Sequence, residues 1–226
     1  MTAPTVLFDL DGTLLATSRD LMHSLNHVLA DDGLAKVNYE DMTWLVGQGA
    51  KAMIERAHDL RGHAVSKERL DALMALFVDH YSAGMPGETV PFPGLMAALD
   101  RLDAAGMKLA VCTNKIQSLA VKLLEGLDMA HRFAAITGGD TFDIKKPHGD
   151  HVLRTIDMAG GSRAHAVMVG DSVNDILAAQ NAGVPAIAVP FGYTDKPVET
   201  FNPDVVIAHF DELDAALIER LIAAKA

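Results

Sequence analysis

Cysteine is almost absent from this chain of 226 residues, because Cys112 is the only one. A single cysteine excludes a disulfide within the chain, and this usage is typical of a reducing compartment. Cys112 follows the apolar run 109–111, so we interpret it as a small buried side chain of a strand. The expected location of the protein is cytoplasmic.

Long apolar runs are missing as well. No stretch approaches the roughly 18 residues that a membrane span requires, and no signal peptide pattern precedes Asp9. We therefore expect no membrane partner. Hydrophobic residues still make up 50% of the chain and charged residues 22%, which suits one sizeable core and a smaller accessory domain.

Positive charge is scarce: 19 lysines and arginines face 30 acidic residues, for a formal net charge of −11 at pH 7. Duplex nucleic acids are bound through basic surfaces, so this balance argues against nucleic acid as the main partner. An anionic substrate would need positive charge that is concentrated locally. The candidates for that charge are Arg19, Lys51, Lys115, Lys145 and Lys146.

Short apolar runs alternate with helical patterns along most of the chain. Helical patterns occur at 95–105 and 176–182, and Gly106 and Gly183 lie where such helices commonly end in a left-handed residue. The alternation predicts an α/β fold, a doubly wound parallel sheet with a Rossmann-like core and helices on both faces. The expected strands are 6–10, 109–112, 134–137, 166–169, 186–189 and 205–208.

Residues 18–85 break this alternation, because they contain helical patterns only. Asn38 and Ser66 can cap two of these helices. The return segment 87–93 is rich in proline and glycine, which is typical of a hinge. We predict an inserted all-helical cap domain of residues 17–87 on a catalytic core formed by residues 1–16 and 88–226.

Asp9 and Asp11 stand at the end of the first expected strand, directly before Gly12. Side chains two residues apart on a strand point to the same side, and glycine allows a sharp turn after them. Alone, this pattern is also typical of an acidic turn or of part of a calcium loop. We discard the calcium loop because apolar residues 14–16 stand where it needs oxygen ligands.

Three later polar segments also follow expected strands, and the carboxyl ends of parallel strands meet at one edge of a sheet. Clustered carboxylates need a cation, and Mg²⁺ suits a site that also holds phosphate. A threonine and an amide at a helix start can cradle that phosphate, and a lysine adds a point charge. The residues concerned are Asp9, Asp11, Thr113, Asn114, Lys146, Asp171 and Asp175.

This grouping predicts phosphoryl transfer in two steps. One carboxylate attacks phosphorus and forms an aspartyl-phosphate. The other carboxylate protonates the leaving oxygen and then takes a proton from the hydrolytic water. The metal and Lys146 neutralise the charge of the phosphoryl group, so that an anionic nucleophile can approach it.

With these motifs in this order, the chain resembles the haloacid dehalogenase superfamily of phosphohydrolases over essentially its whole length. The resemblance implies that Asp9 is the nucleophile and Asp11 the general acid and base, with its backbone carbonyl on the metal. It implies that Thr113 and Lys146 bind the phosphoryl group. Asp171 would be a metal ligand and Asp175 its partner. The helical insertion resembles the cap of one class in this family.

Within the superfamily the resemblance is closest to bacterial phosphoglycolate phosphatases, which implies 2-phosphoglycolate as the substrate. Ala16 and Gly149 depart from the residues common in those relatives. A sugar-phosphate or nucleotide phosphatase, or a mutase similar to β-phosphoglucomutase, stays an alternative. A non-catalytic regulatory relative would have lost Asp9 or Lys146, and both are present.

The cap is expected to choose the leaving group, because the core motifs bind the phosphoryl group that all such substrates share. The cap candidates for this selection are Arg19, Gln48 and Lys51, with Gln48 in a Gly-Gln-Gly turn. The expected partner is a small phosphorylated metabolite. We expect the enzyme to be a monomer or a homodimer.

Overall fold

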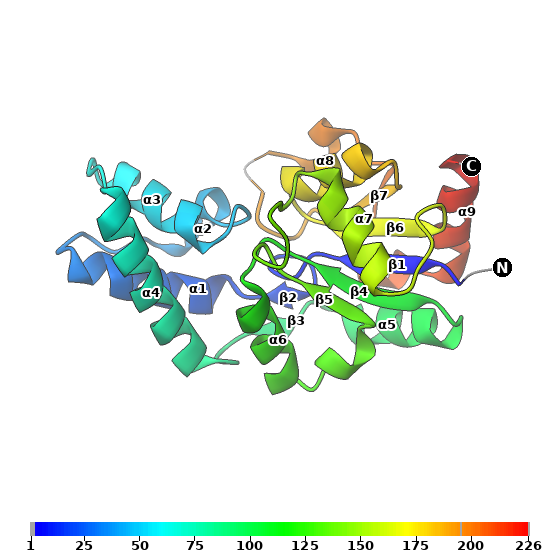
Figure 1. The fold of residues 1–226 in the computed structure, drawn as a ribbon, viewed down its shortest axis with the longest axis horizontal. Helices are drawn as coiled ribbons and strands as arrows, with labels where there is room; N and C mark the ends of the chain where they lie inside the picture. The colour runs from blue at the N-terminus through cyan, green and yellow to red at the C-terminus, as the bar shows by residue number, and fades with distance from the viewer. Residues whose placement is uncertain (1–2, 195, 226) are drawn as a thin grey trace.

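A six-stranded parallel sheet forms the centre of the computed structural model, which describes residues 3–194 and 196–225 and, at residues 43 and 44, the backbone alone. The strand order is β5-β4-β1-β6-β7-β8 (Figure 1). All six predicted strands are confirmed. Their bounds are β1 Thr5–Phe8, β4 Lys108–Cys112, β5 Ala135–Thr137, β6 Ala166–Gly170, β7 Ala186–Ala188 and β8 Val205–Val206.

Helices cover both faces of this sheet, as the alternation of strands and helices predicts. On one face, α5 (Leu95–Ala104), α6 (Gln117–Gly126) and α9 (Ala215–Lys225) pack against Val6 and Phe8. The opposite face, with Leu7, packs against α7 and α8. These two helices span Gly149–Met158 and Val173–Ala182, and short 3₁₀ helices span Ala130–Arg132, Val198–Phe201 and Phe210–Glu212.

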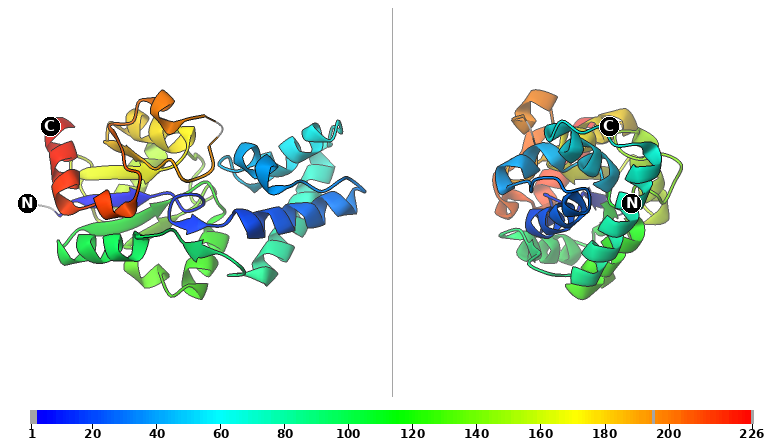
Figure 2. Two further views of the ribbon diagram at one scale, coloured as in Figure 1. Left: turned by 180° about the vertical axis from the view of Figure 1, so that it is seen from behind. Right: turned by 90° about the vertical axis from the view of Figure 1, so that its left-hand side faces the viewer.

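The inserted segment forms a helical body beside the sheet (Figures 1 and 2), and its hydrophobic core includes one residue from outside the insertion, Leu119 of α6. Asn38 and Ser66 cap α2 and α4 as expected, by accepting hydrogen bonds from backbone N–H groups three residues later. None of the helices in the described residues is long and apolar enough to cross a membrane. The bounds are α1 Ser18–Asp31, α2 Tyr39–Leu45, α3 Ala50–Leu60 and α4 Lys67–Gly84.

Two short antiparallel strands connect this helical body to the sheet. β2 (Leu15–Ala16) precedes α1, and β3 (Val90–Pro91) carries the chain back after α4. Nothing in the sequence predicts this ribbon, because two-residue strands are too short for an alternating pattern. The domain limits that we propose, after residue 16 and before residue 88, lie next to it.

A carboxylate at the start of α1 fastens the returning segment. Asp20 Oδ1 accepts a hydrogen bond from the Glu88 N–H at 3.1 Å, and Oδ2 accepts one from Thr89 Oγ1 at 2.6 Å. Gly87 adopts a φ of 62°, and a Cβ added there would lie 2.5 Å from Asp20 Oδ1. Position 87 therefore needs glycine for two reasons: the backbone there is left-handed, and Asp20 lies too close to leave room for a Cβ.

We expect Gly87→Ala to lower the free energy of unfolding more than Gly33→Ala does. Both glycines have positive φ, and the strain of a left-handed alanine costs roughly 1 kcal/mol at either site. Gly33 has open space around an added Cβ, whereas Gly87 does not. In Gly87→Ala the displacement of Asp20 should increase the loss of unfolding free energy by roughly another 1 kcal/mol. Urea denaturation followed by circular dichroism measures both losses, and equal losses would contradict the fastening role.

Candidate active site

Polar side chains from distant parts of the chain meet at the carboxyl edge of the sheet. Asp9 follows β1, Thr113 follows β4 and Asp171 follows β6. Asp175 lies in the first turn of α8, and Lys146 lies between β5 and α7. The parallel register of β1 with both β4 and β6 brings these strand ends side by side.

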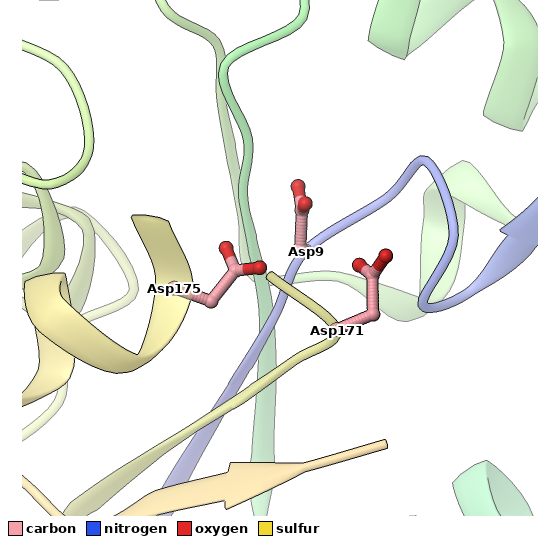
Figure 3. A group of neighbouring side chains, drawn as sticks. All are labelled: Asp9, Asp171 and Asp175. Carbon is pink, nitrogen blue, oxygen red and sulfur yellow. The ribbon is translucent and has the colours of Figure 1, made fainter. Parts of the chain in front are cut away.

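Asp9, Asp171 and Asp175 form a buried acidic cluster. One carboxylate oxygen of each lies within 4.8 Å of the others, and Figure 3 shows the three side chains gathered around one point. Asp171 and Asp175 are each only 1% exposed, and Asp9 is 6% exposed. Buried carboxylates at this spacing repel one another unless a cation lies between them.

Lys146 supplies one positive charge to the cluster. Its Nζ lies 2.9 Å from Asp9 Oδ1 and 2.5 Å from Asp175 Oδ1. Burial would lower the pKa of Lys146, but the two aspartates hold it above its usual value. Burial raises the pKa of Asp9 to about 6, and the nearby Lys146 opposes part of this rise. One ammonium thus faces three carboxylates.

Hydrogen bonds fix the orientation of the two aspartates that follow β6. Asp171 accepts from Thr13 Oγ1 at 2.7 Å and from the Tyr193 N–H at 2.6 Å. Asp175 Oδ2 accepts from the N–H and the hydroxyl of Ser172, at 2.9 and 2.6 Å. Burial, then the charges of Asp175 and Asp9, raise the pKa of Asp171. These carboxylates are held in place and still lack a full counter-charge.

The donor set fits a hard divalent cation. Carboxylate oxygens are the ligands that Mg²⁺ and Ca²⁺ prefer, and the cluster contains three of them around one point. A divalent cation there would compensate the negative charge that Lys146 leaves over. The structure therefore contains a candidate metal site formed by Asp9, Asp171 and Asp175.

Thr113 and Asn114 lie beside the acidic cluster, where β4 ends. The Thr113 side chain is buried, and its Oγ1 accepts a hydrogen bond from the Lys115 N–H at 3.2 Å. Asn114 Nδ2 donates to the backbone oxygen of Lys146 at 3.1 Å, which ties the second motif to the third. Asn114 Oδ1 is buried and has no hydrogen-bond partner among the residues that the structure describes.

Asp11 faces a lysine and a tyrosine that the sequence analysis did not assign to the site. Lys115 Nζ donates to Asp11 Oδ1 and Oδ2 at 2.9 and 3.1 Å, and to the hydroxyl oxygen of Tyr81 at 2.9 Å. The Lys115 side chain is only 4% exposed. Lys115 was considered only as one of several local positive charges. Tyr81 belongs to an apolar stripe of α4, and nothing in the sequence pattern marks its hydroxyl as part of the site.

A cavity lies between the cap helices and the carboxyl edge of the sheet. Asp9, Asp11, Thr113 and Asn114 line it from the core, and it is partly open to solvent. From the cap, the residues that line it are Leu21, Val46, Gly47, Gly49, Ala50, Met53, Phe77 and Tyr81.

The cap candidates occupy different places relative to this cavity. The turn around Gln48 reaches the core, because the Gly47 oxygen accepts from Asn174 Nδ2 at 3.1 Å. The guanidinium of Arg19 instead pairs with Glu88 at 3.1 Å, and its side chain is 68% exposed. Lys51 is likewise exposed, and it pairs with Asp71 at 2.5 Å. Neither charge lines the cavity.

Comparison with known proteins identifies the family. The haloacid dehalogenase-like hydrolase family matches residues 6–189. The chain belongs to this family. A phosphoglycolate phosphatase of Agrobacterium fabrum is 54% identical to this hydrolase over 221 residues, which cover 98% of this chain and 95% of the relative. A phosphoglycolate phosphatase of Mesorhizobium japonicum is 46% identical over 224 residues, 99% of each chain.

Similar solved structures agree with the assignment of this hydrolase to the family. A predicted phosphoglycolate phosphatase from Haemophilus somnus superposes with a TM-score of 0.85 at 27% identity, covering 97% of this chain and 99% of that one. CbbY from Rhodobacter sphaeroides, in complex with phosphate, superposes with a TM-score of 0.82 at 25% identity, covering 97% and 100%. The hydrolase is therefore a phosphoric monoester hydrolase similar to phosphoglycolate phosphatases.

We expect a divalent cation to raise the Tm of this hydrolase, because it would relieve repulsion among buried carboxylates in the folded state alone. A ligand at one hundred times its Kd stabilises by about 2.7 kcal/mol. Asp171→Ala should reduce the increase in Tm, because the site loses a ligand. Thermal unfolding in EDTA, in Mg²⁺ and in Mn²⁺ measures the effect. An unchanged wild-type Tm in both metals would contradict the metal site.

Proposed function

We propose that this hydrolase cleaves 2-phosphoglycolate with Mg²⁺ through an aspartyl-phosphate on Asp9. The observation that carries the proposal is the cluster of Asp9, Asp171, Asp175 and Lys146, in which Asp9 lines the interdomain cavity together with Asp11. The names of the similar phosphoglycolate phosphatases support this substrate.

In the first step a carboxylate oxygen of Asp9 attacks phosphorus, and the bond between phosphorus and the leaving oxygen breaks. Asp11 donates a proton to that oxygen, so the leaving group departs as an alcohol. The Thr113 hydroxyl, the Asn114 backbone and Lys146 bind the phosphoryl oxygens and compensate their charge. The product of this step is glycolate together with phosphorylated Asp9.

In the second step a water molecule attacks the phosphorus of the aspartyl-phosphate. Asp11, now ionised, takes a proton from this water, and the bond between phosphorus and the Asp9 oxygen breaks. Inorganic phosphate leaves, and both aspartates return to their initial states. A cap that covers the cavity during the first step limits premature access of water.

Mg²⁺ is the proposed cofactor because the donor set consists of carboxylate oxygens beside a phosphate site. The proposed ligands are the side chains of Asp9, Asp171 and Asp175 and, following the family resemblance, the backbone carbonyl of Asp11. Bound there, the ion would neutralise phosphoryl charge and let the anionic nucleophile approach. The side chain of Asp11 is left out of this ligand set, because its two oxygens accept hydrogen bonds from Lys115.

A sugar phosphate is the second candidate substrate. CbbY from Rhodobacter sphaeroides, which superposes with a TM-score of 0.79 at 26% identity, is known in complex with xylulose-(1,5)bisphosphate. The side chains of Leu21, Met53 and Phe77, which line the present cavity, offer no hydrogen bonds to the hydroxyls of a sugar, and this disfavours the second candidate. Arg19, Gln48 and Lys51 stay proposals for substrate selection, and Arg19 and Lys51 would have to leave their present partners.

A phosphate-release assay tests the substrate. The purified enzyme is given 2-phosphoglycolate, glucose 6-phosphate, glucose 1-phosphate and a nucleoside monophosphate, each with Mg²⁺. We expect the highest kcat/KM on 2-phosphoglycolate, by about tenfold or more, since one matched charge in a dry site is worth about 1.5–3 kcal/mol. A higher kcat/KM on a sugar phosphate would replace the proposed substrate by the second candidate.

We expect Asp9→Asn to abolish turnover and to leave the fold intact. An amide cannot form the acyl-phosphate, and removing a buried charge relieves repulsion in the acidic cluster. Circular dichroism controls for folding, and mass spectrometry of acid-quenched wild type tests for a phosphorylated Asp9. Multiple turnovers by a folded Asn variant, free of wild-type enzyme, would exclude the covalent mechanism.

A further inference from the structure

Lys115 carries the only positive charge among the described residues that line the interdomain cavity. It is the residue directly after Thr113 and Asn114, so it reaches the cavity from the core. Its partner Tyr81 reaches the cavity from α4 of the cap, and the ammonium also lies 4.4 Å from the centre of the tyrosine ring. This pair therefore spans the two sides of the cavity.

The remaining walls offer no other counter-charge for an anionic leaving group. The side chains of Leu21, Met53 and Phe77 from the cap, and of Ile116 and Leu119 from the core, are apolar. A carboxylate in such a cavity is unstable unless it is paired. The two acidic residues of the lining would repel it, so its position is restricted to the surroundings of Lys115.

The short distance between Lys115 and Asp11 suits a leaving group whose carboxylate lies close to its leaving oxygen. Asp11 must lie next to the leaving oxygen to protonate it, and Lys115 Nζ lies 2.9 Å from an Asp11 oxygen. In 2-phosphoglycolate a single methylene separates the leaving oxygen from the carboxyl carbon. A leaving group that hydrogen-bonds to Asp11 thus brings its carboxylate into the neighbourhood of the ammonium.

Lys115 has enough donors for this contact. An ammonium offers three N–H groups. Two are used by Asp11 and one by Tyr81, and releasing one Asp11 oxygen frees a donor for the substrate. The tyrosine oxygen accepts from Lys115, so its own proton remains for a second carboxylate oxygen. Burial raises the pKa of Tyr81 to about 12, which keeps that proton in place.

We propose that Lys115 determines the specificity of the hydrolase by binding the carboxylate of the leaving group, with Tyr81 holding the ammonium and donating its hydroxyl proton to the same carboxylate. This inference rests on the proposed activity toward 2-phosphoglycolate. Because Tyr81 belongs to the cap and Lys115 to the core, the carboxylate site is complete only while α4 lies against the core.

The test compares two substrates that share the phosphoryl group and a two-carbon leaving group. These are 2-phosphoglycolate and ethyl phosphate, which lacks the carboxylate. The measured quantity is the preference, defined as kcat/KM on 2-phosphoglycolate divided by kcat/KM on ethyl phosphate. Loss of Asp11 positioning would lower both rates by a common factor, whereas loss of carboxylate binding lowers the preference itself.

We expect Lys115→Met to reduce the preference on the order of 10- to 100-fold, because a charge-assisted hydrogen bond is lost in a dry site. Lys115→Arg should retain part of the preference. Tyr81→Phe should reduce it less than Lys115→Met does, mainly through a higher KM on 2-phosphoglycolate. The matched control is Lys122→Met, since Lys122 likewise reaches from the core to α4, through Ser82, but on the exposed surface.

The outcomes separate the inference from the proposed function. A wild type that shows no preference for 2-phosphoglycolate overturns the proposed function and the inference together. A wild type with the preference, joined to a Lys115→Met variant that keeps it, overturns the inference alone. Circular dichroism establishes folding of each variant. Should Lys115→Met fail to fold, an unchanged preference in both Lys115→Arg and Tyr81→Phe overturns the inference.

Discussion

The bridge that Lys146 forms between Asp9 and Asp175 is the interaction on which the site depends. It joins the end of β1 and the first turn of α8 through a buried ammonium. Without it, carboxylates that are almost fully buried would face one another unpaired, at a cost of several kcal/mol. With it, the three carboxylates still outnumber the one ammonium, and this excess negative charge favours the binding of a divalent cation.

The carboxyl edge of the sheet also explains how one chain can separate action on the phosphoryl group from recognition of the leaving group. The strand ends hold the groups that act on the phosphoryl moiety, and these groups are fixed by the parallel register. About half of the residues that line the cavity above them belong to the cap, and these are free to differ without disturbing that register. Lys115, Ile116 and Leu119 line the same cavity from the core, so the separation is not complete.

The strands and the catalytic core were predictable because each depends on local signals. Buried runs such as 109–112 are apolar throughout, and the polar residues after them had to meet at one edge. The pairing of Lys115 with Tyr81 was not predictable, since it needs the distance between two elements far apart in sequence. Arg19 is a similar case: its exposed pairing with Glu88 depends on the path of the returning segment.

The β2–β3 ribbon carries both chain crossings between the cap and the core, and the Asp20 contacts fasten it. The other contacts between the two bodies are noncovalent, so their loss would leave the cap able to swing about this ribbon, with a displacement that grows with distance from the pivot. The turn at Gly47, which rests on Asn174, would have to part from the core in such a swing. A small change in ribbon angle would thus be amplified into a wide opening for product exit.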